Sequence, residues 1–253
     1  MSGPLVPNLR GFMVSKAGEP GASCRDAWRA SSRRAGLPVH SGLRVAIADG
    51  ATIASASGLW AQLLVKTAVE CKAPWSRTPY RTGILAIKRA EWHRQARAAL
   101  AQPLPWFAEA ALDRGAFSTL LRAEVEGNAW RAEGWGDSCL FHLRDGLPIR
   151  ALPDLEPEDF EKSPYLLASI QGHDEGIARN LLFARGNLLR GDVLLLATDA
   201  LACWLVTTGT WSETLREVRS LRSEEDFSLW VDELRRERGL RNDDTTLVLV
   251  EFQ

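Results

Sequence analysis

Four aspartates stand where apolar segments begin or end, a placement that suits a metal site. They are Asp49 after RVAIA, Asp137 in WGDS, Asp199 after VLLLAT and Asp243 before TTLVLV. An aspartate at a strand end is held by rigid backbone, and converging carboxylates repel one another unless a cation neutralises them. Their hard oxygen atoms suit Mg²⁺ or Mn²⁺. The pattern therefore predicts a divalent-metal site lined by carboxylates, with ordinary turn aspartates as the alternative.

The segments that position these aspartates have the features of β-strands. Short apolar runs bounded by turn residues predict strands over residues 43–48, 192–197 and 245–252. The dipeptide Asp145-Gly146 is a hairpin signal. An antiparallel meander is expected around it, and the remaining strands are expected over residues 9–15, 26–32, 117–126, 129–135, 138–144 and 148–152.

Helical patterns occur in two blocks, one on each side of the meander. The expected helices cover residues 57–73, 85–100, 106–114, 212–221 and 224–238. Residues 74–83 and 153–189 have the composition of loops, the second with short strands near 166–170 and 180–183. Strands throughout the chain and helices in two blocks predict an α+β fold built in layers. We expect a single domain over residues 1–253.

The composition excludes several classes of function. The chain has 253 residues, with 31 Lys+Arg against 32 Asp+Glu, so a polybasic tail for nucleic acid or a membrane surface is not expected. Its four cysteines lack the CxxC spacing of zinc knuckles. No stretch approaches the roughly 20 apolar residues that a membrane helix needs. We therefore expect a cytoplasmic protein that binds neither nucleic acid nor membrane.

Five short motifs occur in order along the whole chain. They are CRDA at 24–27, IADG at 47–50, GWGDS at 134–138, ATDAL at 197–201 and NDDTTLVLV at 242–250. Their order resembles the protein phosphatase 2C family of metal-dependent serine/threonine phosphatases, in a divergent bacterial branch. The resemblance implies a four-layer αββα sandwich, in which two antiparallel sheets are flanked by helices and the metal site lies in a cleft at one end.

The resemblance also implies how metal ions would be bound. Asp49 would bridge two Mn²⁺ or Mg²⁺ ions, and the backbone carbonyl of Gly50 would bind one of them. Asp199 and Asp243 would complete the ligands of the first ion. Asp137 would help to bind a weaker third ion.

The implied chemistry is hydrolysis of a phosphate ester. Asp26 would orient the attacking water, so Asp26 and Asp49 are the expected catalytic residues. Two ions would lower the pKa of a bridging water, whose hydroxide would attack phosphorus in line with the leaving serine or threonine oxygen. The implied substrate is a phosphorylated protein, and a cognate serine/threonine kinase is an expected partner. A small phosphorylated metabolite is an alternative substrate.

Four residues depart from the pattern of the family and motivate another interpretation. Arg25 replaces an acidic residue, and Gly21 stands where a phosphate-binding arginine is expected. Ala200 and Cys203 replace a glycine and a metal-binding aspartate. The alternative function is a catalytically weak regulatory module that binds a phosphoprotein or a kinase, although the retained metal-site aspartates favour the enzyme. Phosphate binding then falls to nearby arginines, the candidates being Arg25, Arg29, Arg33 and Arg34.

Overall fold

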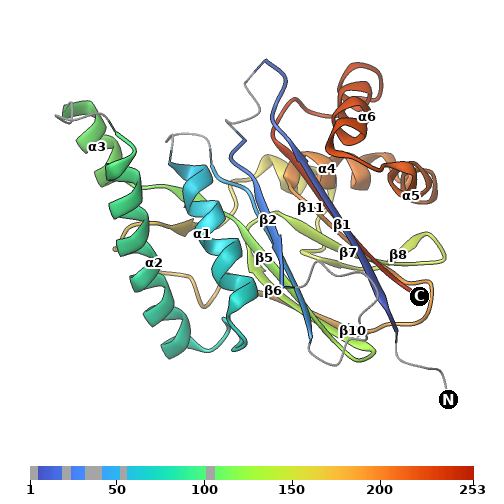
Figure 1. Ribbon diagram of the computed structural model, residues 1–253, viewed down its shortest axis with the longest axis horizontal. Helices are drawn as coiled ribbons and strands as arrows, with labels where there is room; N and C mark the ends of the chain where they lie inside the picture. The colour runs from blue at the N-terminus through green and yellow to red at the C-terminus, as the bar shows by residue number, and fades with distance from the viewer. Residues whose placement is uncertain (1–4, 19–23, 32–41, 52–55, 101–105) are drawn as a thin grey trace.

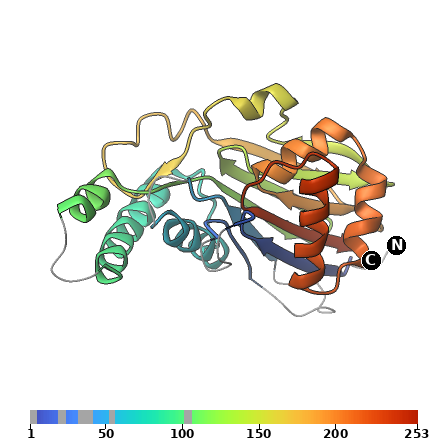
Figure 2. The same ribbon diagram turned by 90° about the horizontal axis from the view of Figure 1, so that it is seen from above.

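The chain folds into two antiparallel sheets that pack face to face between two groups of helices (Figures 1 and 2). This arrangement is seen in a computed structural model that describes residues 5–18, 24–31, 42–51, 56–100 and 106–253. The α+β class and the four-layer αββα sandwich predicted from the sequence are confirmed.

The first sheet has the strand order β1-β12-β11-β7-β8, and each pair is antiparallel. Side chains alternate between the two faces of a strand, and both faces of β11 are covered. Leu195 packs toward the helices, whereas Leu194 and Leu196 pack between the sheets. The strands are β1 (Pro7–Val14), β12 (Thr245–Phe252), β11 (Val193–Ala197), β7 (Cys139–Arg144) and β8 (Leu147–Leu152).

The second sheet has the order β10-β6-β5-β3-β2 and is also antiparallel. Its strands are β10 (Leu182–Asn187), β6 (Ala129–Trp135), β5 (Leu120–Glu126), β3 (Leu43–Ala48) and β2 (Ala27–Ala30). A separate pair is formed by β4 (Phe117–Ser118) and β9 (Leu167–Ala168).

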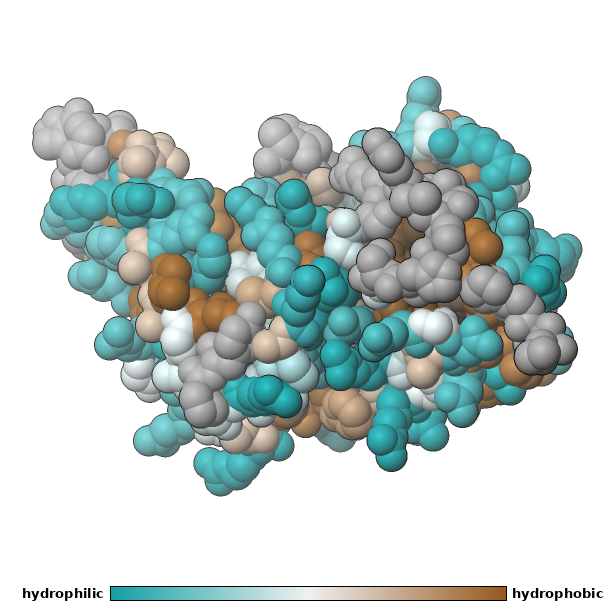
Figure 3. Space-filling model, turned by 60° about the horizontal axis from the view of Figure 1, so that its bottom comes forward, coloured by the Kyte–Doolittle hydropathy of each residue, from teal (hydrophilic) through white to brown (hydrophobic). Residues whose placement is uncertain are grey.

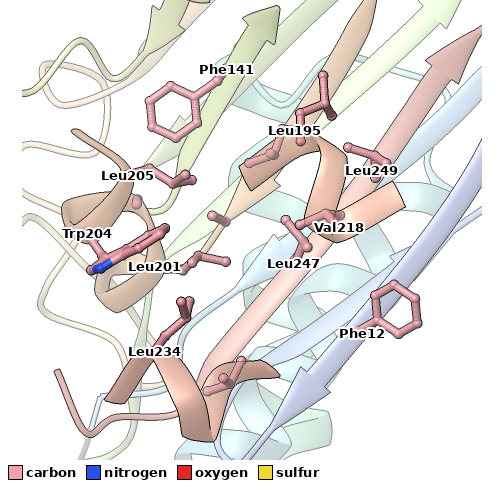
Figure 4. Packing of buried hydrophobic residues seen from close by; sticks show 14 of the residues in the cluster. Phe12, Phe141, Leu195, Leu201, Trp204, Leu205, Val218, Leu234, Leu247 and Leu249 are labelled. Atoms are coloured by element: carbon pink, nitrogen blue, oxygen red, sulfur yellow. The ribbon is translucent and has the colours of Figure 1, made fainter. Parts of the chain in front are cut away.

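Helices cover both outer faces of the sandwich (Figure 1). Helix α1 packs on the second sheet, with α2 and α3 beyond it, while α4, α5 and α6 lie on the first sheet (Figure 2). Figure 4 shows leucine, valine and aromatic side chains filling the space between the first sheet and its helices. The helices are α1 (Ser57–Glu70), α2 (Thr78–Ala98), α3 (Trp106–Arg114), α4 (Asp199–Thr208), α5 (Trp211–Ser220) and α6 (Glu224–Glu237).

Two helices differ from the sequence-based expectation. Helix α2 extends into the expected loop over residues 74–83, because a proline in its first turn needs no N–H donor there. Helix α4 was not expected. Its ten residues are mostly apolar and give no clear one-sided pattern, and Gly209 ends the helix with a φ of 63°.

Two other segments also differ. The expected strand over residues 117–126 is divided at Thr119 into β4 and β5, because Thr119 turns to bind the end of β3. The expected loop over residues 153–189 contains a 3₁₀ helix (Pro157–Glu161) that was not expected, and its two expected short strands are found as β9, within 166–170, and as β10, which extends beyond 183 to Asn187. The hairpin at Asp145-Gly146 is confirmed, with φ values of 53° and 78°.

Hydrophilic side chains predominate on the face of the molecule shown in Figure 3. This agrees with a chain in which 25% of the residues are charged. Among the described residues, no helix combines the length and the apolar character needed to span a bilayer.

Candidate metal centre

Three neighbouring strands of the first sheet have their ends side by side at one end of the sheet. Because β11 runs antiparallel to both β7 and β12, Ala197 pairs with Cys139 on one side and Leu247 on the other. The aspartates expected to bind metal stand a few residues from these pairs along the chain. Strand pairing therefore brings Asp137, Asp199 and Asp243 together at this end of the sheet.

The end of β3 in the second sheet brings Asp49 and Gly50 to the same place. These two residues and the three aspartates of the first sheet line one pocket of about 270 Å³. The pocket therefore contains all five residues predicted to bind metal. Their role as metal ligands stays a prediction.

The backbone of Asp49 is fixed by two hydroxyl side chains. Its N–H donates to Thr119 Oγ1 at 2.8 Å, and its carbonyl accepts from the Thr119 N–H at 2.9 Å and from Ser118 Oγ at 2.8 Å. Thr119 Oγ1 also lies 2.8 Å from Ser138 Oγ. Since Ser138 follows Asp137, this hydrogen-bonded link sets the end of β3 beside the start of β7.

Gly50 stands where backbone segments approach too closely for any side chain. A Cβ atom at this position would lie 2.7 Å from the Arg25 carbonyl oxygen and 2.8 Å from the Ser57 carbonyl carbon. Both contacts are to backbone, which cannot turn away as a flexible side chain does. Only glycine fits here, and its small size lets the chain reach the pocket wall.

Asp26 lies just behind the pocket and is 2% exposed. Its Oδ2 accepts hydrogen bonds from the hydroxyls of Thr198 at 2.9 Å and Thr246 at 2.8 Å. Its Oδ1 has no hydrogen-bond partner among the described residues. Thr198 immediately precedes Asp199, so the carboxyl group of Asp26 is tied to the strand ends that carry the metal-site aspartates.

Asp244 is a positioning residue that the sequence-based reasoning did not single out. Its Oδ1 accepts from the Lys16 N–H at 2.9 Å, and its Oδ2 accepts from the Arg25 N–H at 2.7 Å. The buried carboxylate therefore holds the CRDA segment, with Asp26, against the start of β12. The only signal in the sequence is the doubled aspartate Asp243-Asp244.

Arg241 is a second residue that the sequence did not reveal. Its Nη2 forms an ion pair with Asp199 Oδ2 and lies 3.7 Å from Asp243 Oδ2. A single guanidinium thus contacts two of the expected metal ligands, although Arg241 is not itself among the residues that line the pocket.

Burial and mutual repulsion give the carboxyl groups unusual acidities. Burial raises the pKa of Asp26 to about 8, in spite of the two hydroxyl hydrogen bonds that favour its charged form. Burial, and then the charge of Asp199, raise the pKa of Asp137 to about 6. The pKa of Asp49 is raised well above its usual range by burial and then by the charge of Asp26. The pocket therefore favours cations.

The donor atoms of the pocket fit Mn²⁺ or Mg²⁺. They are carboxylate oxygens together with the Gly50 carbonyl, which are the hard ligands that these ions prefer. Among the described residues, however, no three acidic, histidine or cysteine side chains converge tightly enough to surround an ion. In this structure two of the carboxylates, those of Asp199 and Asp243, are paired with Arg241 instead. A metal ion bound here would compete with Arg241 for Asp199 and Asp243.

Of the four candidate phosphate-binding arginines, Arg25 lines the pocket. Arg29 is exposed on β2 and does not line it. Ala200 and Cys203 lie on α4 and are not part of the pocket wall either. The remaining residues of interest, Gly21, Arg33 and Arg34, lie outside the described residues.

A second pocket of about 550 Å³ adjoins the first and shares Ala51 and Leu166 with it. Phe117, Ile170 and His173 contribute to its wall. The rings of Phe117 and His173 meet edge to face, with their centroids 5.3 Å apart. A largely apolar pocket beside a strongly acidic one suits a ligand with both polar and apolar parts.

Comparison with known proteins places the fold. No protein-family model matches the chain, and neither does any curated protein sequence. Its structure is similar to that of PppA, "a key regulatory component of T6SS in Pseudomonas aeruginosa", with a TM-score of 0.56 and 23% identity over 98% of this chain and 100% of that one. It is also similar to the serine/threonine phosphatase PstP/Ppp of Mycobacterium tuberculosis, with a TM-score of 0.59 and 18% identity over 98% and 99% of the two chains.

A third similar structure is the serine/threonine phosphatase Stp1 of Staphylococcus aureus, with a TM-score of 0.59 and 13% identity over 97% of this chain and 95% of that one. The chain therefore has the fold of the phosphatase 2C family, and the resemblance seen in the motifs is confirmed at the level of the fold. One structure of the PstP catalytic domain contains two manganese ions.

Proposed function

We propose that this chain is a metal-dependent phosphatase that hydrolyses phosphoserine and phosphothreonine in proteins. The observation that carries the proposal is the convergence of five predicted metal-binding residues in one pocket of a phosphatase 2C fold. A module that only binds a phosphorylated partner has no chemical need for a cluster of carboxylates, which would repel phosphate.

Two Mn²⁺ or Mg²⁺ ions would be held by Asp49, Asp199, Asp243 and the carbonyl of Gly50. Asp137 would stand beside a weaker third ion. When bound, the ions supply Lewis-acid activation of a water for attack on phosphorus. The manganese ions in the PstP structure support this assignment for the fold.

Asp26 is assigned to orienting the attacking water. Two hydroxyl groups hold its Oδ2 and so fix the direction of its Oδ1, for which the described residues offer no hydrogen-bond partner. With a pKa raised to about 8 by burial, the carboxyl group keeps its proton near neutral pH while the pocket holds no cation. Nearby cations favour the carboxylate, which accepts a hydrogen bond from water at Oδ1.

The rest of the pocket suits a phosphoprotein substrate. Arg25 and Lys162 line the acidic pocket and supply positive charge for phosphate. The adjoining apolar pocket offers space for side chains next to the phosphorylated residue. This supports a polypeptide over a small phosphorylated metabolite. A serine/threonine kinase as partner and a cytoplasmic location complete the proposal.

The test is to compare three substrates at millimolar Mn²⁺: a phosphothreonine peptide, a phosphoserine peptide and a sugar phosphate. The proposal expects phosphate release from both peptides, with a higher kcat/KM than for the sugar phosphate. Faster turnover of the sugar phosphate would indicate a metabolite hydrolase. The absence of turnover with all three substrates would contradict enzymatic function.

The alternative is a catalytically weak regulatory module that binds a phosphoprotein or a kinase. It is favoured by Arg241, which already neutralises part of the charge on Asp199 and Asp243. PppA, whose structure is similar, is described as a regulatory component. This alternative expects saturable binding of the phosphothreonine peptide without phosphate release, and without any dependence on Mn²⁺.

A further inference from the structure

Arg241 reaches the expected metal site from the solvent side. Its side chain is 48% exposed, whereas the Asp199 side chain that it pairs with is 16% exposed. The second contact, to Asp243 Oδ2, is longer at 3.7 Å. The guanidinium is therefore about half exposed while it contacts the two carboxylates.

The ion pair and the expected metal ion require the same carboxylates. Arg241 binds Asp199 Oδ2, and both Asp199 and Asp243 are predicted ligands of the first metal ion. A half-exposed arginine–carboxylate pair is weak, because water screens the attraction and ordering the side chain costs entropy. A divalent ion with several carboxylate ligands can displace it.

The displaced guanidinium stays tethered beside Asp199 and Asp243, and a substrate phosphate bound by metal ions at these carboxylates would lie near it. Arginine donates two parallel N–H bonds to two phosphate oxygens, a geometry that a lysine cannot reproduce. The chain places glycine, Gly21, where its family resemblance predicts a phosphate-binding arginine. Arg241 is an arginine that already contacts two of the metal-site carboxylates, those of Asp199 and Asp243.

We propose that Arg241 has two alternative partners: in the metal-free protein it neutralises Asp199 and Asp243, and once metal displaces it, it binds the phosphate of the substrate. The inference rests on the proposed metal-dependent function. It predicts opposite effects on the two ligands when the arginine is removed. The metal binds more tightly because a competitor is lost, and phosphate binds more weakly because a donor is lost.

The test measures two constants in the wild-type chain and in Arg241→Ala. The first is the dissociation constant of Mn²⁺, by calorimetric titration of metal-stripped protein. The second is the inhibition constant of inorganic phosphate, measured at saturating Mn²⁺. We expect Mn²⁺ to bind about fivefold more tightly in the variant, which corresponds to about 1 kcal/mol, and phosphate to bind about tenfold more weakly.

The matched control is Arg219→Ala, which removes an ion pair of similar exposure. Its partner Glu251 lies at the end of β12 opposite to the end that carries Asp243. Arg219 is 44% exposed and its partner Glu251 is 16% exposed, with 2.7 Å between Nε and Oε1. Neither constant should change in this control. Arg241→Lys should keep most of the competition with metal, because the charge is retained, yet should bind phosphate more weakly than the wild type.

Opposite changes in the two constants cannot arise from partial unfolding, which weakens both. If both constants weaken, or if only one of them changes, the two-partner role is overturned. If wild type binds Mn²⁺ and hydrolyses the phosphothreonine peptide while Arg241→Ala is indistinguishable from it, this inference alone fails. If neither wild type nor Arg241→Ala binds Mn²⁺, the proposed function fails with it.

Discussion

The raised pKa of Asp26 has a measurable effect on the stability of the metal-free protein. In the folded protein this carboxyl group keeps its proton up to about pH 8, whereas in the unfolded chain it loses the proton near the ordinary value of 3.8. Below the pKa of the unfolded chain both states are protonated, and the full contribution of this group to the folding stability is present. As pH rises toward 8, the unfolded state is increasingly favoured, so stability falls.

The size of the effect follows from the two pKa values. A difference from 3.8 to about 8 corresponds to a total of roughly 6 kcal/mol, at about 1.4 kcal/mol for each pKa unit. Between pH 5 and pH 7 one such group contributes nearly the full slope, which amounts to about 3 kcal/mol over this interval. Asp49 and Asp137, whose pKa values are also raised by burial, add to the slope in the same direction.

The perturbation that isolates this term is Asp26→Asn, which keeps the shape of the side chain and removes the titration. Urea unfolding of wild type and variant would be measured in EDTA at pH 5, 6 and 7, with linear extrapolation to water. The slope of unfolding free energy against pH should be less steep in the variant by about 1.4 kcal/mol per pH unit.

Asp226→Asn is the control, because Asp226 lies at the start of α6, far from the pocket, and hydrogen bonds from Arg222 and Ser223 lower its pKa. It is ionised throughout this range, so its removal should leave the slope unchanged. Equal slopes in wild type and Asp26→Asn would show that the buried carboxyl group does not carry a raised pKa.

Two further predictions concern the walls of the two pockets. Gly50→Ala should lower the unfolding free energy by about 1–3 kcal/mol through overpacking against backbone. Gly83→Ala, in an exposed turn of α2 with open space around it, should raise that free energy by about 0.5–1 kcal/mol. Urea unfolding measures both changes, and equal effects of the two substitutions would refute the packing argument. Phe117→Ala should raise KM for a phosphothreonine peptide about tenfold, with little change in KM for p-nitrophenyl phosphate. An equal change for both substrates would exclude the second pocket as a binding site for the peptide.

The strand ends of the site were predictable because each has a local signal. An apolar run followed by Asp-Gly marks the end of β3, and the run before Asp199 marks the end of β11. Apolar runs and turn residues depend on a few neighbouring positions, so they can be recognised without knowledge of the fold. This is why the strands and the aspartates at their ends could be predicted from local patterns, whereas the arrangement in two sheets was implied by the resemblance in the order of the motifs.

The remaining features of the site depend on contacts between distant segments. The hydrogen bond from Arg25 to Asp244 joins residues 219 positions apart, and the ion pair of Arg241 with Asp199 joins residues 42 apart. No local pattern distinguishes Asp244 or Arg241 from other charged residues in loops. The burial of Asp26 likewise exists only once β12 and α4 surround it.

The central claim is that metal ions bound in this pocket activate the hydrolysis of phosphorylated proteins. The most direct measurement is the rate of phosphate release from a phosphothreonine peptide by metal-stripped protein, as Mn²⁺ is added, for wild type and Asp49→Asn. Asp49 is the proposed shared ligand, and removing its charge relieves repulsion in the metal-free pocket, so the variant should remain folded.

The account predicts a saturable, Mn²⁺-dependent rate in wild type that falls at least a hundredfold in Asp49→Asn, about 3 kcal/mol in the activation barrier, while circular dichroism shows an intact fold. A rate that does not depend on Mn²⁺, or one that a folded Asp49→Asn retains, would contradict it.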